Sequence, residues 1–329
     1  MILQFIFLIV GLVLILVGAD ALVNGASTVA RKYGISEFVV GLTIVGIGTS
    51  APELVVSVMS AINGSSDIAI GNVVGSNISN VFMILGITAL ISPIALTKEN
   101  IKYDLPISIG VSLLLFFLAY DTIFLGKQND IISRLDGVIL LICFILFMIY
   151  SFKSSSSSLE EDDAKMSDNE SNAQKINVLK SSLLIIAGLA GLIIGGRLFV
   201  NSGSAIAKGF GVSDAFIGIT VMAVGTSLPE LAASVNAALK KKGQMALGNV
   251  IGSNIFNILL ILGTSSVINP LTLGDITMVD FSVMILTSVL ILLSALLISR
   301  KKIKRVVGGI FFAIYVAYII YLASNLQTA

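Results

Sequence analysis

The sequence contains no histidine, no tryptophan and a single cysteine. Without histidine, the chain lacks the usual imidazole ligand of zinc sites and the usual general base of hydrolases. Cys143 cannot form a disulfide within the chain, and we expect it to pack as a small hydrophobic residue in its apolar run. The net charge of +1 provides no basic field for nucleic acid. These absences disfavour a zinc enzyme and a nucleic-acid-binding protein.

Charged residues are also scarce, at 12% of the chain, whereas hydrophobic residues make up 56% and the mean hydropathy is +1.02. A soluble domain carries about 25% charged residues. The composition therefore predicts a polytopic membrane protein. Residues 1–16 lack the positive start and the small-residue cleavage site of a signal peptide, so we expect them to begin a retained first helix.

Apolar segments long enough to cross a bilayer, about 20 residues each, recur along the chain. We expect ten membrane helices, near residues 2–24, 37–62, 67–91, 104–121, 132–152, 177–201, 214–239, 244–268, 278–299 and 304–323. The predicted domains are a first repeat over 1–152, a disordered linker over 153–176 and a second repeat over 177–329.

The two halves match at one fixed offset, because Thr226 follows Thr49 by 177 positions (226 − 49). The densest match aligns residues 71–78, Gly-Asn-Val-Val-Gly-Ser-Asn-Ile, with residues 248–255, Gly-Asn-Val-Ile-Gly-Ser-Asn-Ile. An odd number of spans per repeat places the halves upside down relative to each other. The predicted fold is therefore an all-α membrane protein with ten transmembrane helices in two inverted repeats of five.

The distribution of lysine and arginine sets the orientation, because cytoplasmic loops are enriched in both. With these spans, 16 of the 20 basic residues fall on one face and 4 on the other. This bias predicts a multi-pass protein of the plasma membrane with both termini extracellular and the linker in the cytoplasm. Asp20 and Arg197 occupy equivalent repeat positions near opposite faces, and we expect both to extend to the membrane interface.

A second repeated motif places a carboxylate at membrane depth. Residues 48–53 read Gly-Thr-Ser-Ala-Pro-Glu, and residues 225–230 read Gly-Thr-Ser-Leu-Pro-Glu. An ionisable residue inside the membrane is costly and indicates a functional site. The proline lacks an N–H and frees a carbonyl one turn earlier, which predicts a broken helix. Glu53 and Glu230 are thus predicted to form one site.

The following helix adds a polar stripe in each half. Asn72, Ser76 and Asn80 lie four residues apart on one helical face, and Asn249, Ser253 and Asn257 repeat the pattern. The donors are therefore oxygens, which hard cations such as Ca²⁺ prefer. Two carboxylates neutralise one divalent ion, and when it leaves they repel each other unless Na⁺ or protons replace it. This set favours ion exchange over simple release.

Structural roles are the alternative for several of these residues. Interhelical hydrogen bonding is a serious alternative role for Ser76, Ser253, Asn80 and Asn257. Asn72, Asn77, Asn249 and Asn254 could serve as caps or interhelical bonds, and the glycines beside them allow close helix packing.

The two doubled motifs resemble the alpha repeats of the calcium/cation antiporter superfamily, specifically its sodium/calcium exchangers of prokaryotic type. The resemblance spans essentially the whole chain. It implies that the second, third, seventh and eighth helices form the ion-binding core, and that the first and sixth slide across it. It also implies a potassium-independent exchanger, because Asn257 stands where some members carry Asp. The short linker has no room for the calcium-sensing insert of eukaryotic exchangers.

The resemblance further implies the ion ligands. Ca²⁺ would be held by Glu53, Glu230, Thr49 and Thr226, and Na⁺ by the same glutamates with Ser50, Ser76, Ser227, Ser253 and the carbonyls of Gly46 and Ala223, with Asn80 and Asn257 completing the centre. No cofactor and no partner beyond Na⁺, Ca²⁺ and the lipid bilayer are expected, and the chain is predicted to work as a monomer.

The predicted function is exchange of Na⁺ for Ca²⁺ by alternating access. A proton/calcium exchanger could use the same carboxylates, and the residues alone do not separate the two. A passive cation channel is a further alternative, although channels usually assemble their pore from several subunits. An intramembrane enzyme is disfavoured because no base or activated nucleophile is evident.

Overall fold

The computed structural model describes residues 2–124, 126, 129–162, 178–210, 223–274, 276–298 and 302–326, and nearly all of them are helical. The elements of the first half, with η marking π-helical turns, are α1 (Ile2–Tyr33), α2 (Glu37–Val40), η1 (Gly41–Val45), α3 (Gly46–Thr49), α4 (Ala51–Ile62), α5 (Ser66–Ser79), η2 (Asn80–Leu85), α6 (Gly86–Ile91), β1 (Ile94–Ala95), η3 (Asn100–Asp104), α7 (Leu105–Ala119), α8 (Asp121–Phe124), β2 (Ile131–Ile132) and α9 (Arg134–Asp162). Those of the second half are α10 (Val178–Gly209), α12 (Ala223–Thr226), α13 (Leu228–Leu239), α14 (Gly243–Phe256), η6 (Asn257–Leu262), α15 (Gly263–Ile268), β3 (Leu271–Thr272), α16 (Met278–Leu293), η7 (Ser294–Ile298), β4 (Lys302–Ile303) and α17 (Arg305–Leu326).

The described residues contain 7 helices long and apolar enough to cross a membrane, or 8 if one bent pair counts as a span. That pair, Glu37–Thr49 and Ala51–Ile62, is bent by 47° where the proline motif predicts a break. Arg305–Ile320 is apolar but shorter, and part of the expected span at 214–239 lies outside the described residues. A multi-pass helical membrane protein is therefore observed, while the full count of ten helices stays a prediction.

Three helices extend well beyond their expected ends. α1 continues past residue 24 to Tyr33, and α10 continues past residue 201 to Gly209. Hydropathy falls at the polar ends of these helices, but buried residues such as Ala26 and Ala30 continue the packing face of α1. α9 continues to Asp162, so residues 153–162, expected within the disordered linker, are helical because no proline or glycine interrupts them. The rest of that linker lies outside the described residues.

The internal repeat is accompanied by matching element boundaries. α4 and α13, α5 and α14, η2 and η6, α6 and α15, and β1 and β3 each begin and end 177 positions apart. Two short antiparallel pairings join the halves, with β1 paired to β4 and β2 paired to β3. Equivalent strands therefore take partners from the opposite half.

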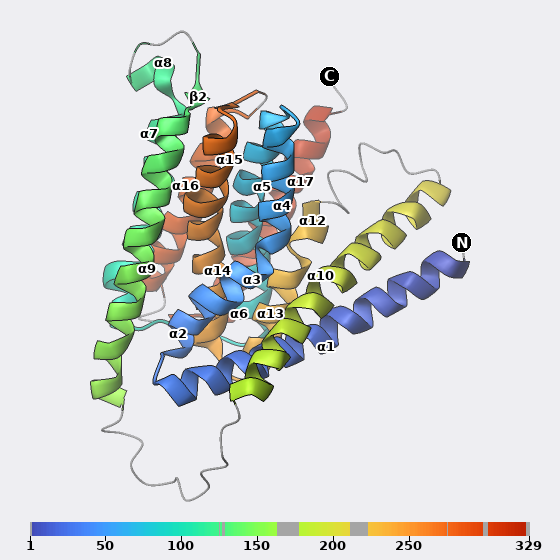
Figure 1. Cartoon of the computed structure of the whole chain (residues 1–329), viewed down its shortest axis with the longest axis vertical. Helices are drawn as coiled ribbons and strands as arrows, with labels where there is room; N and C mark the ends of the chain where they lie inside the picture. The colour runs from blue at the N-terminus through green and yellow to red at the C-terminus, as the bar shows by residue number, and fades with distance from the viewer. Residues whose placement is uncertain are drawn as a thin grey trace, which may run out of the picture.

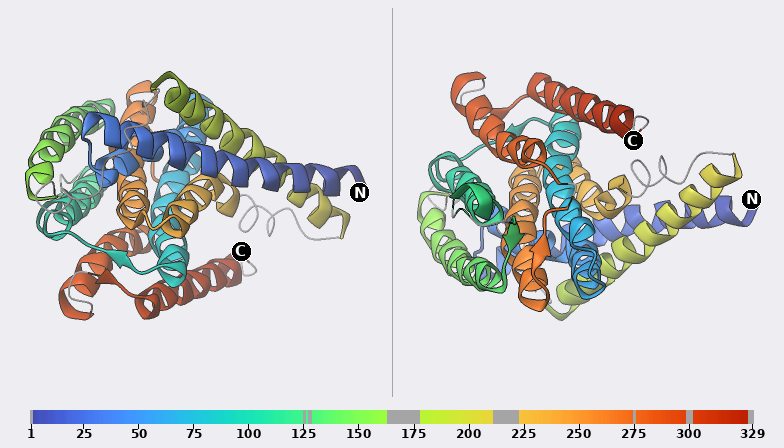
Figure 2. Two further views of the ribbon diagram at one scale, coloured as in Figure 1. Left: turned by 90° about the horizontal axis from the view of Figure 1, so that it is seen from below. Right: turned by 90° about the horizontal axis from the view of Figure 1, so that it is seen from above.

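The long helices α1 and α10 lie side by side and cross the more upright helices of the bundle (Figures 1 and 2). Glycines permit this close antiparallel contact. A Cβ at Gly18 would lie 2.8 Å from the Gly188 carbonyl oxygen, and one at Gly11 would lie 2.8 Å from that of Gly195. Close backbone approach through small residues is the usual basis of helix association in a membrane.

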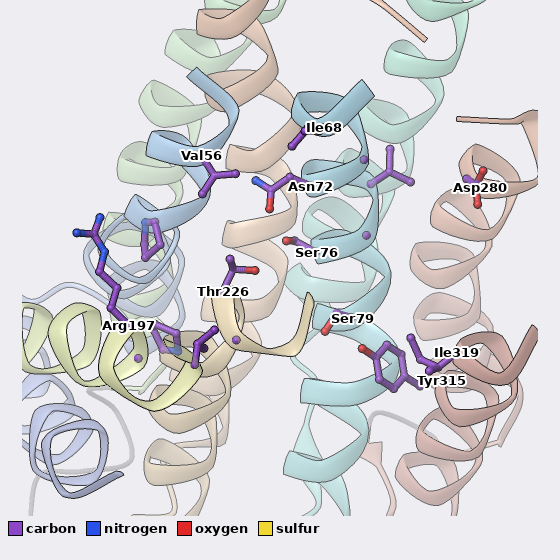
Figure 3. Close-up of a pocket in the computed structure, with 18 of the residues that line it drawn as sticks. Val56, Ile68, Asn72, Ser76, Ser79, Arg197, Thr226, Asp280, Tyr315 and Ile319 are labelled. Atoms are coloured by element: carbon purple, nitrogen blue, oxygen red, sulfur yellow. The ribbon is translucent and has the colours of Figure 1, made fainter. Parts of the chain in front are cut away.

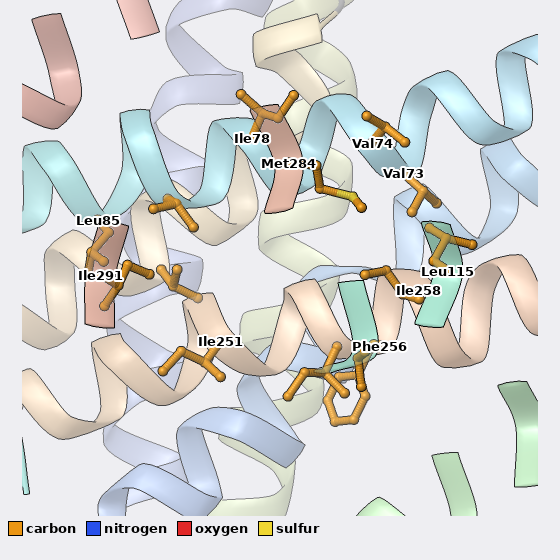
Figure 4. Packing of buried hydrophobic residues seen from close by; sticks show 14 of the residues in the cluster. Val73, Val74, Ile78, Leu85, Leu115, Ile251, Phe256, Ile258, Met284 and Ile291 are labelled. Carbon is orange, nitrogen blue, oxygen red and sulfur yellow. The ribbon is translucent and has the colours of Figure 1, made fainter. Parts of the chain in front are cut away.

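The core is built around α5 and α14 with their π-turns. In the most apolar window of Gly243–Ile268, 94% of the residues are buried, against 22% for Ile2–Tyr33. Figure 4 shows Val73 and Ile78 of α5 packed near Ile251 and Ile258 of the α14–η6 segment. The peripheral helices expose large apolar side chains, as lipid contact requires. This arrangement places α5 and α14 at the centre, next to the broken helices.

Candidate functional site

Both copies of the proline motif adopt the same local backbone. Ser50 has φ −81° and ψ 6°, and Ser227 has φ −85° and ψ 3°. Proline occupies the first turn of the helix that follows each serine, where its missing N–H costs no hydrogen bond. Glu53 and Glu230 therefore lie in the first turns of α4 and α13, at the helix ends that favour negative charge.

The two carboxylates are almost fully buried, with Glu53 1% and Glu230 2% exposed. Glu230 accepts a hydrogen bond from Ser50, three residues before Glu53, so the two motifs meet at one place. Within the described part of the chain, no lysine or arginine forms a salt bridge with either one. Buried carboxylates are normally paired, protonated or bound to a cation.

Hydroxyls of the first half are bound by residues of the second. The Ser50 hydroxyl donates to Oε1 of Glu230 at 3.0 Å and contacts the Ser253 hydroxyl at 3.0 Å. The Thr49 hydroxyl donates to Oδ1 of Asn249 at 3.2 Å and makes a longer contact of 3.5 Å with the Gly46 carbonyl. Both hydroxyls of the first copy of the motif are therefore engaged in contacts with residues of the second half.

The equivalent hydroxyls of the second half are free of such contacts. Ser227 is buried, and its Oγ has no partner among the described residues. Thr226 is half-buried and lines a cavity, and its hydroxyl forms no hydrogen bond within the described ranges. Near-identical sequence motifs thus have different surroundings in this structure.

Three pairs of asparagines organise the helices around the carboxylates. Nδ2 of Asn72 donates to the Glu53 carbonyl at 3.2 Å, and Nδ2 of Asn249 donates to the Glu230 carbonyl at 3.3 Å. The second and third pairs cross between the halves: Asn77 and Asn254 donate to each other's carbonyls, Asn80 donates to Oδ1 of Asn254 and Asn257 donates to Oδ1 of Asn77. These crossed amides hold α5 against α14.

Several buried oxygens at this centre are left without a hydrogen-bond donor among the described residues. They are Glu53 Oε2, Glu230 Oε2, Asn80 Oδ1, Asn257 Oδ1 and Ser227 Oγ. Unpaired buried polar atoms are rare and require an explanation. Oxygens with free lone pairs and two negative charges match the ligands of Ca²⁺ and Na⁺ better than those of a soft metal.

A cavity of about 650 Å³ lies beside this centre (Figure 3). Asn72 and Ser76 of α5 and Thr226 of α12 contribute polar groups to its wall. Ser79, Arg197, Asp280 and Tyr315 also line it. The cavity therefore borders one side of the candidate site.

Glycines reveal the same asymmetry between the halves. A Cβ at Gly252 would lie 2.7 Å from Cα of Leu42, and one at Gly248 would clash with the Phe38 carbonyl, because the α2–η1 segment packs directly on α14. The equivalent Gly75 has open space around it within the described residues, and Gly71 meets only the Ile276 side chain at 3.3 Å. The glycine face of α14 is therefore covered by the α2–η1 segment, whereas the equivalent face of α5 borders the cavity.

The structure brings most of the residues predicted as ligands to one place. Glu53, Glu230, Ser50, Ser253, Asn80 and Asn257 are buried at the helix crossing, and Thr49, Ser76 and Ser227 lie beside them. The Gly46 carbonyl already accepts the Ser50 backbone N–H at 3.1 Å. Ala223 begins α12, and its side chain lies outside the described set. Thr226 lines the cavity and takes no part in the hydrogen bonds that Thr49 and Ser50 make with the second half.

Asn77 and Asn254 form interhelical hydrogen bonds between the halves, which is one of the two structural roles expected for them. The π-turns that start at Asn80 and Asn257 were not anticipated, because no sequence signal marks them. Such turns are frequent at functional sites because they shift the side-chain register.

At the opposite end of the site from the cavity, two ion pairs join the halves. Lys240 binds Asp20 of α1 at 2.6 Å, and Lys242 binds Glu37 of α2 at 3.2 Å. Asp20 is half exposed beside Lys240, and its expected place at the membrane interface stays a prediction. The turn after α13 carries lysines within reach, a long-range contact that sequence spacing does not reveal.

Comparison with known proteins gives a consistent family assignment. The family model described as sodium/calcium exchanger protein matches residues 3–153 and 180–323. A putative antiporter, CaxA, from Alkalimonas amylolytica is 38% identical over 95% of this chain and 96% of its own. The sodium/calcium exchanger MaX1 from Methanosarcina acetivorans is 36% identical over 97% of this chain and 98% of its own.

Solved structures agree with the sequence matches. The sodium-calcium exchanger NCX_Mj, soaked with Na⁺ and Sr²⁺, superposes with a TM-score of 0.81 at 36% identity, covering 97% of this chain and 98% of that one. Proteins of this family carry Na⁺ and Ca²⁺ across membranes, without a cofactor and without the chemistry of an enzyme. The chain therefore belongs to the sodium/calcium exchanger family of membrane antiporters.

Proposed function

We propose that this protein exchanges Na⁺ for Ca²⁺ by exposing a single central site alternately to the two faces of the membrane. Glu53 and Glu230 supply the charge of the site. Thr49, Thr226, Ser50, Ser227, Ser76, Ser253, Asn80, Asn257 and the carbonyls of Gly46 and Ala223 supply its neutral oxygens. One divalent ion or several Na⁺ ions would cancel the two negative charges in turn.

The observation that carries this proposal is the set of unpaired buried oxygens around two carboxylates that lack a cationic partner in the described chain. An empty site with two ionised carboxylates is unfavourable in a medium of low dielectric. A site that is costly to leave empty favours exchange of one cation for another.

The asymmetry of the two halves supports alternating access. Thr49 and Ser50 are closed over by residues of α13 and α14, whereas Thr226 opens on the cavity. In an inverted repeat, exchange of the two environments would close this side and open the other. We propose ten membrane helices in two inverted repeats, with the boundaries 1–152 and 177–329 and a cytoplasmic connection over 153–176.

The proposed orientation follows the basic residues. The turn with Lys240 and Lys242 would face the cytoplasm, where positive charge accumulates, so the cavity beside Ile68 and Asp280 would open to the outside. Both termini would then be extracellular, in the plasma membrane. A duplicated chain closes its own central site, which favours action as a monomer in the lipid bilayer.

Flux of ⁴⁵Ca²⁺ in proteoliposomes tests the coupling ion. A Na⁺ gradient imposed across the liposome membrane is expected to drive Ca²⁺ accumulation that saturates with Ca²⁺ concentration, and a proton gradient alone is expected to drive none. Accumulation driven only by the proton gradient would establish the proton/calcium exchanger instead. Gradient-independent flux that does not saturate would establish a passive channel.

A further inference from the structure

We propose that Asn72 and Asn249 are positioning residues that bind the motif threonine of the opposite half alternately. Asn249 holds Thr49 in the conformation described here, and Asn72 takes Thr226 when access is reversed. The inference rests on the proposed alternating access and adds two residues that are not among its proposed ion ligands.

The orientation of the Asn249 amide is fixed by its neighbours. Nδ2 lies 3.3 Å from the Glu230 carbonyl and 2.9 Å from the Ser234 hydroxyl. A carbonyl can only accept a hydrogen bond, so the nitrogen must face it. Oδ1 is then left to accept the Thr49 hydroxyl at 3.2 Å. One buried amide thus ties the first turn of α13 to the end of α3.

Asn72 makes the same two bonds in its own half. Nδ2 lies 3.2 Å from the Glu53 carbonyl and 2.9 Å from the Ser57 hydroxyl. Its Oδ1 accepts no hydrogen bond from a described residue, and its expected partner by repeat equivalence, Thr226, is likewise unbonded. Both side chains face the cavity (Figure 3). The donor bonds are therefore common to both halves, while the acceptor bond exists in one half only.

A bond present in one half and absent from its equivalent can change the balance between two conformations. The Thr49–Asn249 bond stabilises the conformation in which the cavity on the Asn72 side is open. By equivalence, a Thr226–Asn72 bond would stabilise the reversed conformation. A group stabilises only the state in which its contact is made. Substitution of Asn249 alone and substitution of Asn72 alone should therefore shift the conformational equilibrium in opposite directions.

Two single-cysteine reporters can follow that equilibrium in a Cys143→Ala background. Val56 lines the cavity, whereas its repeat equivalent, Ala233, is 1% exposed. Val56→Cys therefore reports the conformation described here, and Ala233→Cys reports the reversed one. The rate of alkylation by a polar maleimide is measured on purified protein in detergent, where the reagent reaches both faces.

Asn249→Ala is expected to speed alkylation at Ala233→Cys and slow it at Val56→Cys, and Asn72→Ala is expected to do the reverse. The loss of one hydrogen bond corresponds to a change of about 2- to 10-fold in the population ratio. The more sensitive reporter is the one whose conformation is less populated. Shifts in the same direction for both asparagine variants, or no shift in either, would overturn the proposal.

Thr49→Val and Thr226→Val provide a second pair, because valine keeps the shape of threonine and removes only the hydroxyl. Each is expected to shift alkylation in the same direction as its asparagine partner, and Thr49→Val should add nothing in an Asn249→Ala protein. Full additivity would exclude a shared bond. Alkylation requires no transport, so these outcomes are independent of the ⁴⁵Ca²⁺ flux that decides the proposed function.

Discussion

At the scale of single residues, the proposed function assigns to the carboxylates of Glu53 and Glu230 the charge that a transported cation would cancel. A unit charge about 4 Å from an ion contributes about 4 kcal/mol per unit of ion charge at an effective dielectric near 20. For divalent Ca²⁺ this is about 8 kcal/mol, so loss of one carboxylate should weaken Ca²⁺ binding by up to about a million-fold.

Glu53→Gln and Glu230→Gln test this expectation, because glutamine keeps the shape of glutamate and removes its charge. Each variant should remain folded in ion-free buffer but lose the rise in melting temperature that Ca²⁺ gives the wild type, since only bound ligand stabilises the folded state. Thermal unfolding with and without Ca²⁺ measures the difference. A Ca²⁺-dependent rise of wild-type size in either variant would contradict the shared site.

The two motif serines should differ in their effect on stability. Ser50→Ala removes a hydrogen bond to the buried Glu230 carboxylate and is expected to cost about 1.5–3 kcal/mol. Ser227→Ala removes a buried hydroxyl that has no partner in the described chain, so we expect a loss below about 0.5 kcal/mol or a small gain. Unfolding of ion-free protein compares them, and equal losses would be inconsistent with the asymmetry described here.

Some local features of the site could be predicted where a chemical signal repeats. The doubled Thr-Ser-X-Pro-Glu motif indicated the helix break before Ala51, because proline acts locally, and both of its glutamates are buried. It could not distinguish Ser50 from Ser227, since two near-identical motifs predict identical surroundings. That difference depends on which half the neighbouring helices cover.

At the scale of elements, the pairing of α1 with α10 depends on backbone contact at glycine. Gly18→Val would place its Cβ 2.8 Å from the Gly188 carbonyl oxygen and 2.9 Å from the Leu192 nitrogen, so the helices would have to separate. We expect this variant to lower the melting temperature and the exchange rate together.

Gly110→Val in α7 serves as the control, because a Cβ there would meet no described atom within 4 Å. Fluorescence-detected size-exclusion chromatography after heating measures the melting temperature of both variants. Equal melting temperatures of the two variants would show that the close α1–α10 contact does not determine the stability of the protein.

The ion pair between Lys240 and Asp20 joins α1 to the turn after α13, yet its side chains are 26% and 53% exposed. Exposed ion pairs contribute about 0–1 kcal/mol, so Lys240→Gln should change the rate of exchange by less than about fivefold. Steady-state ⁴⁵Ca²⁺ uptake measures this effect. A loss as large as that of Glu53→Gln would assign Lys240 a direct part in transport.

Helix positions were largely predictable because about 20 consecutive apolar residues are needed to cross a bilayer. Helix ends were less so, as the continuation of α1 to Tyr33 and of α9 to Asp162 demonstrates. Hydropathy marks where lipid contact ends, whereas a helix ends where its backbone hydrogen bonds or packing stop.

At the scale of the whole molecule, two equivalent halves adopt different surroundings around one centre. The α2–η1 segment packs on Gly248 and Gly252 of α14, while Gly71 and Gly75 of α5 remain at the cavity. If the halves are inverted as proposed, they can exchange these surroundings without a new fold, which would provide alternating access.

The most direct test of the account is a structure of the wild-type protein determined with Ca²⁺ bound. We predict one ion between α4, α5, α13 and α14, with carboxylate oxygens of both Glu53 and Glu230 about 2.3–2.6 Å from it. An ion held by only one of the two glutamates, or bound outside this helix crossing, would contradict a central site shared by the two halves.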